Sequence, residues 1–297
     1  MRQPIDTVID AEACSSCGEC VRVCPSQAIT MRGRVAVVTG EWSLGCGHCA
    51  AVCPTGAVAV GSLEYRLGLE TVAENEPTRL PEIGSLVALM RSRRSCRNFQ
   101  KKLVPRPVLE DLVRIATTAP SGTNCQPWTF TIAPDHAAVE RLAAAVGGFF
   151  ERLNRKAASP AYRTLARLLA GDALGRYYRE YYESVEEGLR QWREEGRDRL
   201  FHGAPAVILV GCTPGASCPA EDALLATGHI LLAAQAMGLG TCLIGFAVAA
   251  LRQEPQLKRP LGLPSEEDVY SVIAIGYPDE SYLRPAGRRP VTPRYMA

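Results

Sequence analysis

The alternation of apolar and polar positions divides the chain into an early part with short strands and a later part with longer helices. Four short apolar runs in the first sixty residues predict β-strands, at residues 7–9, 29–31, 35–38 and 57–60. From Ile83 onward, apolar residues recur at helical spacing, around 86–90 and again around 109–116. Pro105 and Pro107 precede the second of these segments, as at a helix start. The pattern therefore predicts two regions of different architecture.

The later region also contains strand-like segments. Residues 128–132 alternate, whereas 206–210 and 269–275 are continuously apolar, as in buried strands. Residues 223–251 carry no formal charge, but the Gly238-Leu-Gly240 break follows after about 15 helical residues. A bilayer span needs about 20 residues. We therefore predict a buried helix followed by a strand or loop, no membrane span, and a mixed domain in which helices outnumber strands.

A repeat at an offset of 29 residues organises the early region. The first copy runs from Cys14 to Pro25, and the second runs from Ser43 to Pro54. Each copy has short strand-like runs on both sides. The repeat therefore predicts a duplicated strand–loop–helix–strand unit.

Composition narrows the class of protein. A chain of 297 residues is long enough for two cores of unequal size. The formal net charge of +2 argues against a nucleic-acid binder that depends on broad electrostatics. The first residues show no apolar signal segment, and seven of the twelve cysteines crowd into residues 14–53. These features predict a cytoplasmic location rather than a disulfide-bonded secreted protein.

The cysteine spacing predicts iron–sulfur clusters. The pattern C-x2-C-x2-C-x3-C-P supplies three thiolates from one loop, and its fourth cysteine binds the other cluster in two-cluster ferredoxins. On this pattern the first [4Fe–4S] cluster takes Cys14, Cys17, Cys20 and Cys53. The second takes Cys24, Cys46 and Cys49, with Ser43 at the place of a fourth cysteine. Zinc sites or inert thiols are the alternative, but they do not explain the repeated x3-C-P ending.

Ser43 leaves the nature of the second cluster open. Serine binds iron only as a costly alkoxide, since its hydroxyl is harder and far less acidic than a thiol. The second site could hold a serine-ligated or three-iron cluster, or a cube with an open iron, or it could be empty or refilled by another cysteine. His48 lies within the loop, where it is more simply a solvent-side residue than a ligand.

Four later stretches resemble the signatures of the flavin-dependent nitroreductase superfamily, in family order. They are Arg91-Ser-Arg-Arg-Ser-Cys-Arg97 with Phe99, Ala119-Pro-Ser-Gly-Thr-Asn-Cys-Gln-Pro-Trp128, 234–245, and Gly276-Tyr-Pro278 followed by Arg288-Arg-Pro290. With the early region, the whole chain resembles the ferredoxin-fused subgroup. The resemblance implies an α+β fold, bound FMN, and a homodimer in which two chains share the flavin sites. The basic run alone would equally suit a solvated face or a nucleic-acid patch.

The resemblance also implies a set of FMN-binding residues. Arginine forks and hydroxyls suit a phosphate dianion, and the cation of Arg97 matches the position beside flavin N1 and O2, where it would raise the potential. No G-x-G-x-x-G follows a strand, so no Rossmann site for NAD is predicted. The predicted FMN-binding residues are Arg93, Arg94, Ser95, Arg97, Pro120, Ser121, Asn124, Gln126, Leu243, Ile244, Gly245, Arg288 and Arg289.

We thus predict a ferredoxin-like domain at 1–62, a linker at 63–82 and a nitroreductase-like domain at 83–297. Residues 147–203 have no counterpart in the resemblance; their tyrosines and charges favour surface or dimer helices over a lid above the flavin. The predicted activity passes electrons from ferredoxin or another low-potential donor, through the clusters and FMN, to a nitroaromatic, quinone or enone-like acceptor. No catalytic acid, base or nucleophile is predicted. The alternatives are an electron-transfer or redox-sensing protein without a substrate, and a dehalogenase or flavin-modifying enzyme.

Overall fold

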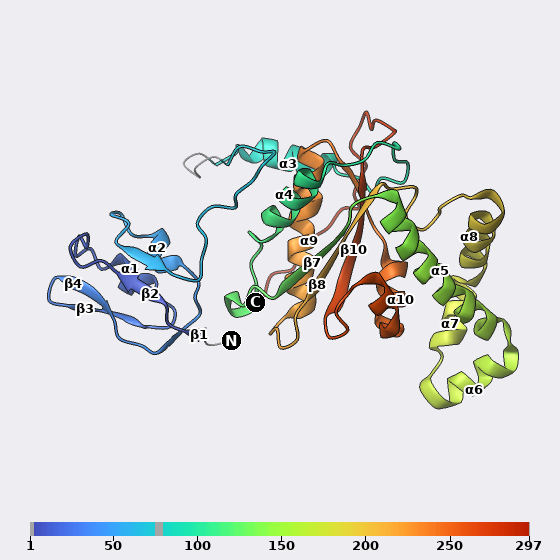
Figure 1. Cartoon of the computed structure of the whole chain (residues 1–297), viewed down its shortest axis with the longest axis horizontal. Helices are drawn as coiled ribbons and strands as arrows, with labels where there is room; N and C mark the ends of the chain where they lie inside the picture. Colours follow the sequence, from blue (N-terminus) through green and yellow to red (C-terminus); the bar gives the residue numbers. More distant parts are fainter. Residues whose placement is uncertain (1–2, 75–79, 297) are drawn as a thin grey trace.

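The computed structural model describes residues 3–74 and 80–296 of the chain. Figure 1 shows a small N-terminal domain at one end, an extended connection, and a larger domain built around a sheet. The larger domain carries a group of helices on the side away from the N-terminal domain.

The N-terminal domain contains two short helices and three two-stranded antiparallel sheets. The helices are α1 (Glu19–Val23) and α2 (His48–Ala51), and each begins inside one of the cysteine loops. The sheet pairs are β1 (Gln3–Pro4) with β5 (Trp42–Ser43), β2 (Thr7–Ile9) with β6 (Val58–Val60), and β3 (Ile29–Arg32) with β4 (Val35–Val38). All four predicted strands and the duplicated unit are therefore present. The small core is formed by Ile29, Ala36, Val58 and Val60 together with Cys20 and Cys49.

The connection between the domains has no regular structure in residues 61–74 and 80–82. The predicted linker covers 63–82, of which 75–79 lie outside the described residues. The first helix of the larger domain, α3 (Ile83–Ser92), follows and ends at the basic run. The extended backbone of Arg93 ends this helix.

A four-stranded antiparallel sheet forms the centre of the larger domain, in the order β7-β8-β10-β9. Its strands are β7 (Trp128–Ala133), β8 (Ala206–Cys212), β10 (Asp268–Gly276) and β9 (Gly240–Leu243). Every residue of β8 is buried, because helices cover both faces of the sheet. The continuous apolar runs predicted this double burial, and the three predicted strands are confirmed.

Two helix layers enclose the sheet, and the side chains of β8 alternate between them. Ile208 and Val210 pack with α4 (Arg106–Ala116) and α9 (Pro219–Ala236). Val207 and Leu209 pack with α5 (His136–Ala158) and α10 (Gly245–Gln253). Short 3-10 turns complete the domain at Gly122–Asn124, Pro255–Leu257 and Arg259–Leu261.

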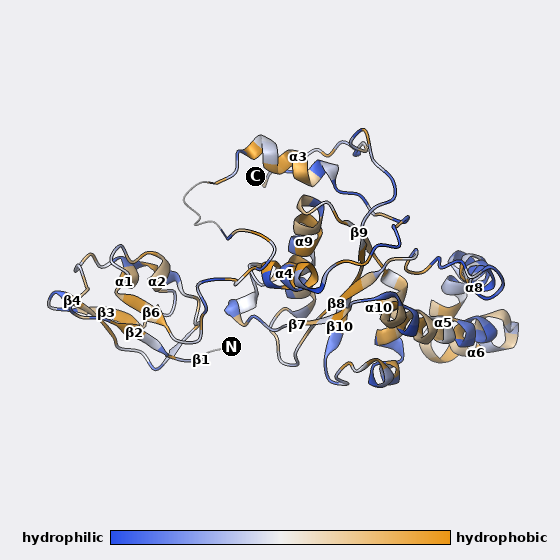
Figure 2. Ribbon diagram, turned by 45° about the horizontal axis from the view of Figure 1, so that its top comes forward, coloured by the Kyte–Doolittle hydropathy of each residue, from blue (hydrophilic) through white to orange (hydrophobic). Residues whose placement is uncertain are grey.

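The stretch without a family counterpart is helical, as expected. It contains the second half of α5 and then α6 (Pro160–Ala170), α7 (Ala173–Glu180) and α8 (Tyr182–Glu195). The ribbon of α8 is largely hydrophilic in Figure 2. Buried Asn154 links these helices: its amide donates to Glu186 at 2.8 Å, and its carbonyl accepts from the Tyr177 hydroxyl at 2.7 Å.

The uncharged segment that begins at Ala223 is part of α9, a helix of the core. Ala223, Ala226 and Ile230 are completely buried there. After Gly238, which has a left-handed backbone, the chain enters β9 as predicted. Among the described residues, no helix combines the length and the apolar character that a membrane crossing requires.

Candidate functional site

The first predicted cysteine set gathers around one cavity of the N-terminal domain. Cys14, Cys17, Cys20 and Cys53 all line it, although Cys53 comes from the second copy of the repeat. The backbone N–H of Ala57 donates to the Cys53 sulfur at 3.2 Å. Four thiols around one space, with an amide donor to sulfur, fit the donor set of a [4Fe–4S] cluster.

The second set gathers in the same way around a separate cavity. Cys24, Cys46, Cys49 and Ser43 line it, together with His48. The N–H of Ala28 donates to the Cys24 sulfur at 3.4 Å, which repeats the contact of Ala57 in the other copy. The structure thus brings the last cysteine of each copy to the cavity lined by the other copy's cysteines.

The fourth position of the second set is occupied by a hydroxyl that already has a partner. The backbone N–H of Gly45 donates to Ser43 Oγ at 3.1 Å. Ser43 thus faces the cavity from the end of β5 and could approach iron only as an oxygen ligand. His48 lines this cavity and is exposed to solvent.

Two glycines start the short helices that carry the cysteines. Gly18 and Gly47 both have φ of 71°, a left-handed conformation that L side chains rarely adopt. Burial raises the pKa of the Cys20 and Cys49 thiols, which lie at the centre of the domain. Metal binding requires the thiolate, so the binding of iron has to offset the free-energy cost of ionising these buried thiols.

The basic run of the larger domain lies at one end of the sheet. Ser95 pairs with Thr241 of β9, and the Cys96 N–H donates to the Thr241 carbonyl at 2.9 Å. An adjoining groove of about 570 Å³ is lined by Arg91 and Arg94, by the glycine break before β9, and by 280–285.

Arg94 has a guanidinium nitrogen that fits an anion. Its Nη1 donates to the carbonyls of Arg91 and Arg93, at 2.8 and 2.6 Å. Its Nη2 is buried and has no hydrogen-bond partner among residues 3–74 and 80–296. Unpaired buried donors are costly and rare. A phosphate in the groove would supply the missing acceptor, so the residues present fit the phosphate of FMN.

Arg97 and the end of β9 continue the same side of the domain. Arg97 is exposed and lies near buried Cys242 and near His202. Burial, opposed by Asp198 and reinforced by Arg97, lowers the pKa of His202 below its ordinary value. The neighbouring predicted residues differ in exposure: Leu243 is 48% exposed, Ile244 is buried, and Gly245 begins α10.

The second predicted flavin stretch forms a tight loop between α4 and β7. The Gly122 N–H donates to the Asp222 carboxylate at 2.8 Å, and the Gln126 N–H donates to Ser121 Oγ at 3.0 Å. Asn124 and Gln126 have positive φ values of 53° and 45°. Pro120, at the start of the loop, is exposed.

The predicted FMN residues do not all meet within one chain. The loop 120–126 is next to the end of the sheet where Trp128 pairs with Cys212, whereas Ser95 lies at the end where Gly240 pairs with Gly276. The nine residues of β10 separate these ends by about 26 Å, more than the length of FMN. Arg288 and Arg289 are exposed in the C-terminal segment and do not line the Arg94 groove.

Two buried carboxylates in this domain were not predicted. Asp222 holds the loop through Gly122 and also accepts from the Cys125 thiol at 3.7 Å. Asp111 on α4 binds the linker. An acidic residue in the first turn of a helix was the only sequence signal for Asp222. Asp111 is buried on α4, but the apolar spacing of that helix gave no signal for it, because an aspartate does not count as an apolar position.

Comparisons with known proteins agree with both parts of the chain. The nitroreductase family model matches residues 90–277, and the 4Fe–4S dicluster domain model matches residues 13–57. An iodotyrosine deiodinase of Thermotoga neapolitana is 29% identical over 202 residues, covering 66% of this chain and 89% of that protein. A 4-nitrobenzoate reductase of Nocardioides is 28% identical over 222 residues, covering 68% and 84%.

The fold comparison points the same way. A crystal structure of a Bacteroides fragilis nitroreductase with bound FMN covers 71% of this chain and 98% of its own, with a TM-score of 0.53 and 20% identity. At that identity the likeness concerns the fold. The chain belongs to the nitroreductase family of flavin-dependent oxidoreductases and carries an N-terminal 4Fe–4S dicluster domain.

Proposed function

We propose that the protein binds FMN and two iron–sulfur clusters and passes electrons from a low-potential donor to a small organic acceptor. The observation that carries this proposal is the pair of cavities lined by the two cysteine sets, in a chain whose other domain has the nitroreductase fold. A domain that stores single electrons is useful to a flavin domain only if electrons pass between them. Ferredoxin or a similar one-electron protein is the donor we propose.

FMN, when bound, supplies the exchange between one-electron carriers and two-electron acceptors. The chain's own residues bind and orient it. The unpaired guanidinium nitrogen of Arg94, with Arg93 and Ser95 beside it, suits the phosphate. The exposed cation of Arg97 suits the negative charge that a reduced ring acquires.

We further propose that two chains complete each flavin site. Within one chain the loop 120–126 and the basic run lie at opposite ends of the sheet. A second copy in antiparallel orientation brings the loop of one chain to the basic run of the other. Apolar side chains are available for such an interface. Ile83, Val87 and Met90 of α3 are 71%, 42% and 47% exposed, and Leu283, Val291 and Tyr295 of the C-terminal segment are 87–93% exposed. Much of the α3 ribbon is hydrophobic in Figure 2.

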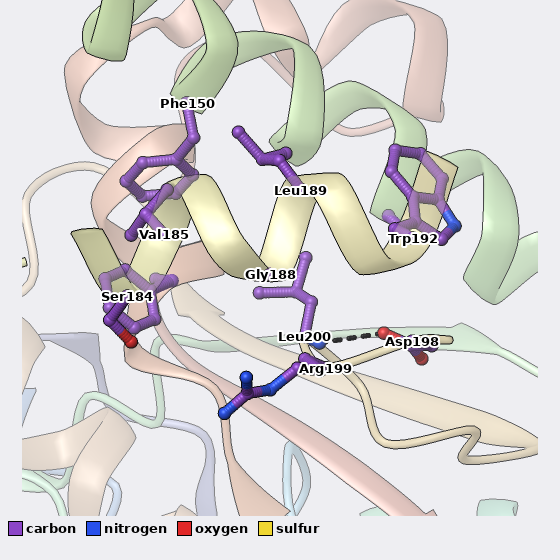
Figure 3. A pocket seen from close by; sticks show the side chains of 11 residues that line it. Phe150, Ser184, Val185, Gly188, Leu189, Trp192, Asp198, Arg199 and Leu200 are labelled. Carbon is purple, nitrogen blue, oxygen red and sulfur yellow. Dashed lines mark hydrogen bonds between the residues drawn. The ribbon is translucent and has the colours of Figure 1, made fainter. Parts of the chain in front are cut away.

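A cavity among the helices of the larger domain suits the acceptor. It measures about 140 Å³ and lies between α5 and α8, with Phe150, Leu189 and Trp192 among its walls and Arg199 at its edge (Figure 3). Phe246 also lines it and directly follows Gly245, one of the predicted FMN residues. The sequence favours surface or dimer helices for 147–203, whereas the aromatic walls of this cavity favour the alternative, a cover over the flavin that suits a flat, electron-poor acceptor such as a nitroaromatic, quinone or enone.

Reductive dehalogenation is the second candidate, because one of the two relatives above is an iodotyrosine deiodinase. Both reactions consume electrons from reduced flavin, so the choice depends on the acceptor. The test is anaerobic turnover of the chemically reduced protein with a nitroaromatic, a quinone, an enone and a halogenated phenol, with identification of each product. Turnover of one class supports an enzyme. No reoxidation by any of them, with FMN and iron in place, would favour an electron-transfer or sensing protein.

A further inference from the structure

A hydrogen bond joins the second cysteine site to the flavin loop. The side-chain amide of Asn124 donates to the Gly45 carbonyl at 3.1 Å. Gly45 directly precedes Cys46, and its own N–H donates to Ser43 Oγ. Gly45, which is buried, thus connects Ser43, at the fourth-ligand position of the second site, to Asn124 of the larger domain.

The loop that carries Asn124 is held in its conformation by its own domain. Its left-handed residues are costly unless surrounding contacts fix them. The Asp222 carboxylate and the Ser121 hydroxyl provide these contacts through Gly122 and Gln126. The Asn124 amide is therefore presented at a fixed place, to which the Ser43–Cys46 turn docks.

A second contact fixes the linker. Asp111 is fully buried and accepts from the backbone N–H groups of Glu70 and Thr71, at 3.0 and 2.7 Å, and from the Thr71 hydroxyl at 2.6 Å. A buried carboxylate with three such donors is a strong anchor. The linker is thus attached to α4 before it reaches α3, so the N-terminal domain is held near the loop end of the sheet.

We infer that the second cysteine site, with Ser43, is positioned to pass electrons to the flavin whose phosphate is bound by the partner chain. This rests on the proposed function, because the loop at which the site docks and the basic run of its own chain lie at opposite ends of the sheet, which β10 separates by about 26 Å. Asn124 and Asp111 are positioning residues in this arrangement. Full reduction of FMN takes two electrons and two protons; the electrons come singly from the donor proposed above, and the protons come from water.

Docking is tested by amide hydrogen exchange of the intact loaded protein. Asn124→Gly removes the side-chain donor but suits the left-handed backbone, and Asp111→Asn weakens the linker anchor. Each should speed exchange of the segment 43–47 about fivefold or more, the effect of losing one hydrogen bond. Asn98→Ala is the matched control, since it removes an exposed asparagine that donates to Glu280 at the other end of the sheet. Unchanged exchange at 43–47 in both variants would overturn the docking.

Delivery between chains is tested with two mixed dimers that share the same pair of changes. One dimer carries Cys46→Ala in one chain and Arg93→Ala in the other; the second carries both changes in one chain beside a wild-type chain. Each should contain about one FMN per dimer, because one phosphate site is impaired. Flavin bleaching by reduced ferredoxin should persist, at about half the wild-type amplitude, only in the first dimer.

The outcomes separate the two proposals. Bleaching confined to the second dimer would show delivery within one chain and would overturn the inference while leaving the proposed function intact. Chains that bind FMN but do not form dimers would refute the shared flavin site, and with it the delivery between chains. If Cys46→Ala unfolds its N-terminal domain, the result stays clear, because electron delivery from that chain's second site is then blocked as well.

Discussion

At the scale of single residues, Arg94 gives the clearest sign of what the larger domain binds. Its unpaired guanidinium nitrogen is buried next to a groove, where only an added acceptor can satisfy it. Neighbouring Arg93 is half-buried at the end of α3 and, within the described part of the chain, makes no hydrogen bonds to the backbone like those of Arg94. Arg93 is therefore the better position at which to test phosphate binding.

We expect Arg93→Ala to cost most of the FMN occupancy. Losing a charge-assisted hydrogen bond is worth about 1.5–3 kcal/mol, or roughly ten- to a hundredfold in affinity. The measurement is FMN per chain after purification, followed by titration of the apoprotein with FMN. The control is Arg141→Ala, at an exposed position on α5. Full FMN in Arg93→Ala would show that this run has been assigned wrongly.

Ser43→Cys should improve the second cluster. A thiolate binds iron more strongly than a hydroxyl, and Ser43 already lines the same cavity as Cys24, Cys46 and Cys49. Iron content or cluster lifetime in air should rise while FMN content stays unchanged. Two ordinary four-iron signals in the wild type, with no gain on substitution, would mean that serine already serves as well as cysteine.

What the sequence could predict at this scale depended on covalent spacing. Cys14 and Cys53 were assigned to one site from the repeat alone, and the structure brings them to one cavity. Asp111 and Asp222 were not found, because their partners are backbone groups 40 and 100 positions away. The separation of Arg93 from Asn124 was also invisible, since the order of motifs along the chain contains no distance in space.

At the scale of elements, apolar patterns predicted the strands and helices that are buried. β8 and β10 were found because both faces are covered, and α4 because one face is. The two-residue strands β1 and β5 were missed, since they are too short to show a period. Ile83, Val87 and Met90 lie at helical spacing but remain exposed on α3, which leaves an apolar face for the proposed partner chain.

The linker anchor on α4 leads to a stability prediction. Burial acts to raise the pKa of Asp111, but hydrogen bonds from Thr71, Glu70 and Arg114 outweigh it and leave the pKa lowered. The ionised group therefore stabilises the fold fully above its unfolded pKa of about 3.9, and this contribution is lost as the pH falls through the lower folded value. Asp111→Asn should cost about 1.5–3 kcal/mol at pH 7.

Urea unfolding followed by helical circular dichroism measures this cost, since nearly all helices belong to the larger domain. The difference between wild type and Asp111→Asn should be constant from pH 7 to pH 5 and should narrow at lower pH. A difference that grows on acidification would contradict the ionised anchor. Glu110→Gln is a suitable control, because it changes a neighbouring, half-exposed carboxylate on the same helix.

At the scale of the whole molecule, the two domains form one electron-transfer path only if the clusters carry electrons to the flavin. Cys17→Ala removes one thiolate of the first site, so turnover driven by reduced ferredoxin should be lost. Turnover after direct chemical reduction of the flavin should remain, because that reaction bypasses the N-terminal domain. Equal ferredoxin-driven turnover in wild type and Cys17→Ala would mean that the clusters are not on the path.

The central claim is that one chain carries both kinds of redox centre. The most direct measurement is an anaerobic absorption spectrum of freshly purified protein, with counts of FMN, iron and sulfide. The account predicts about one FMN per chain, together with about four iron and four sulfide for each complete cluster. Protein that contains zinc in place of iron, or that contains iron–sulfur clusters but neither holds nor takes up FMN, would contradict it.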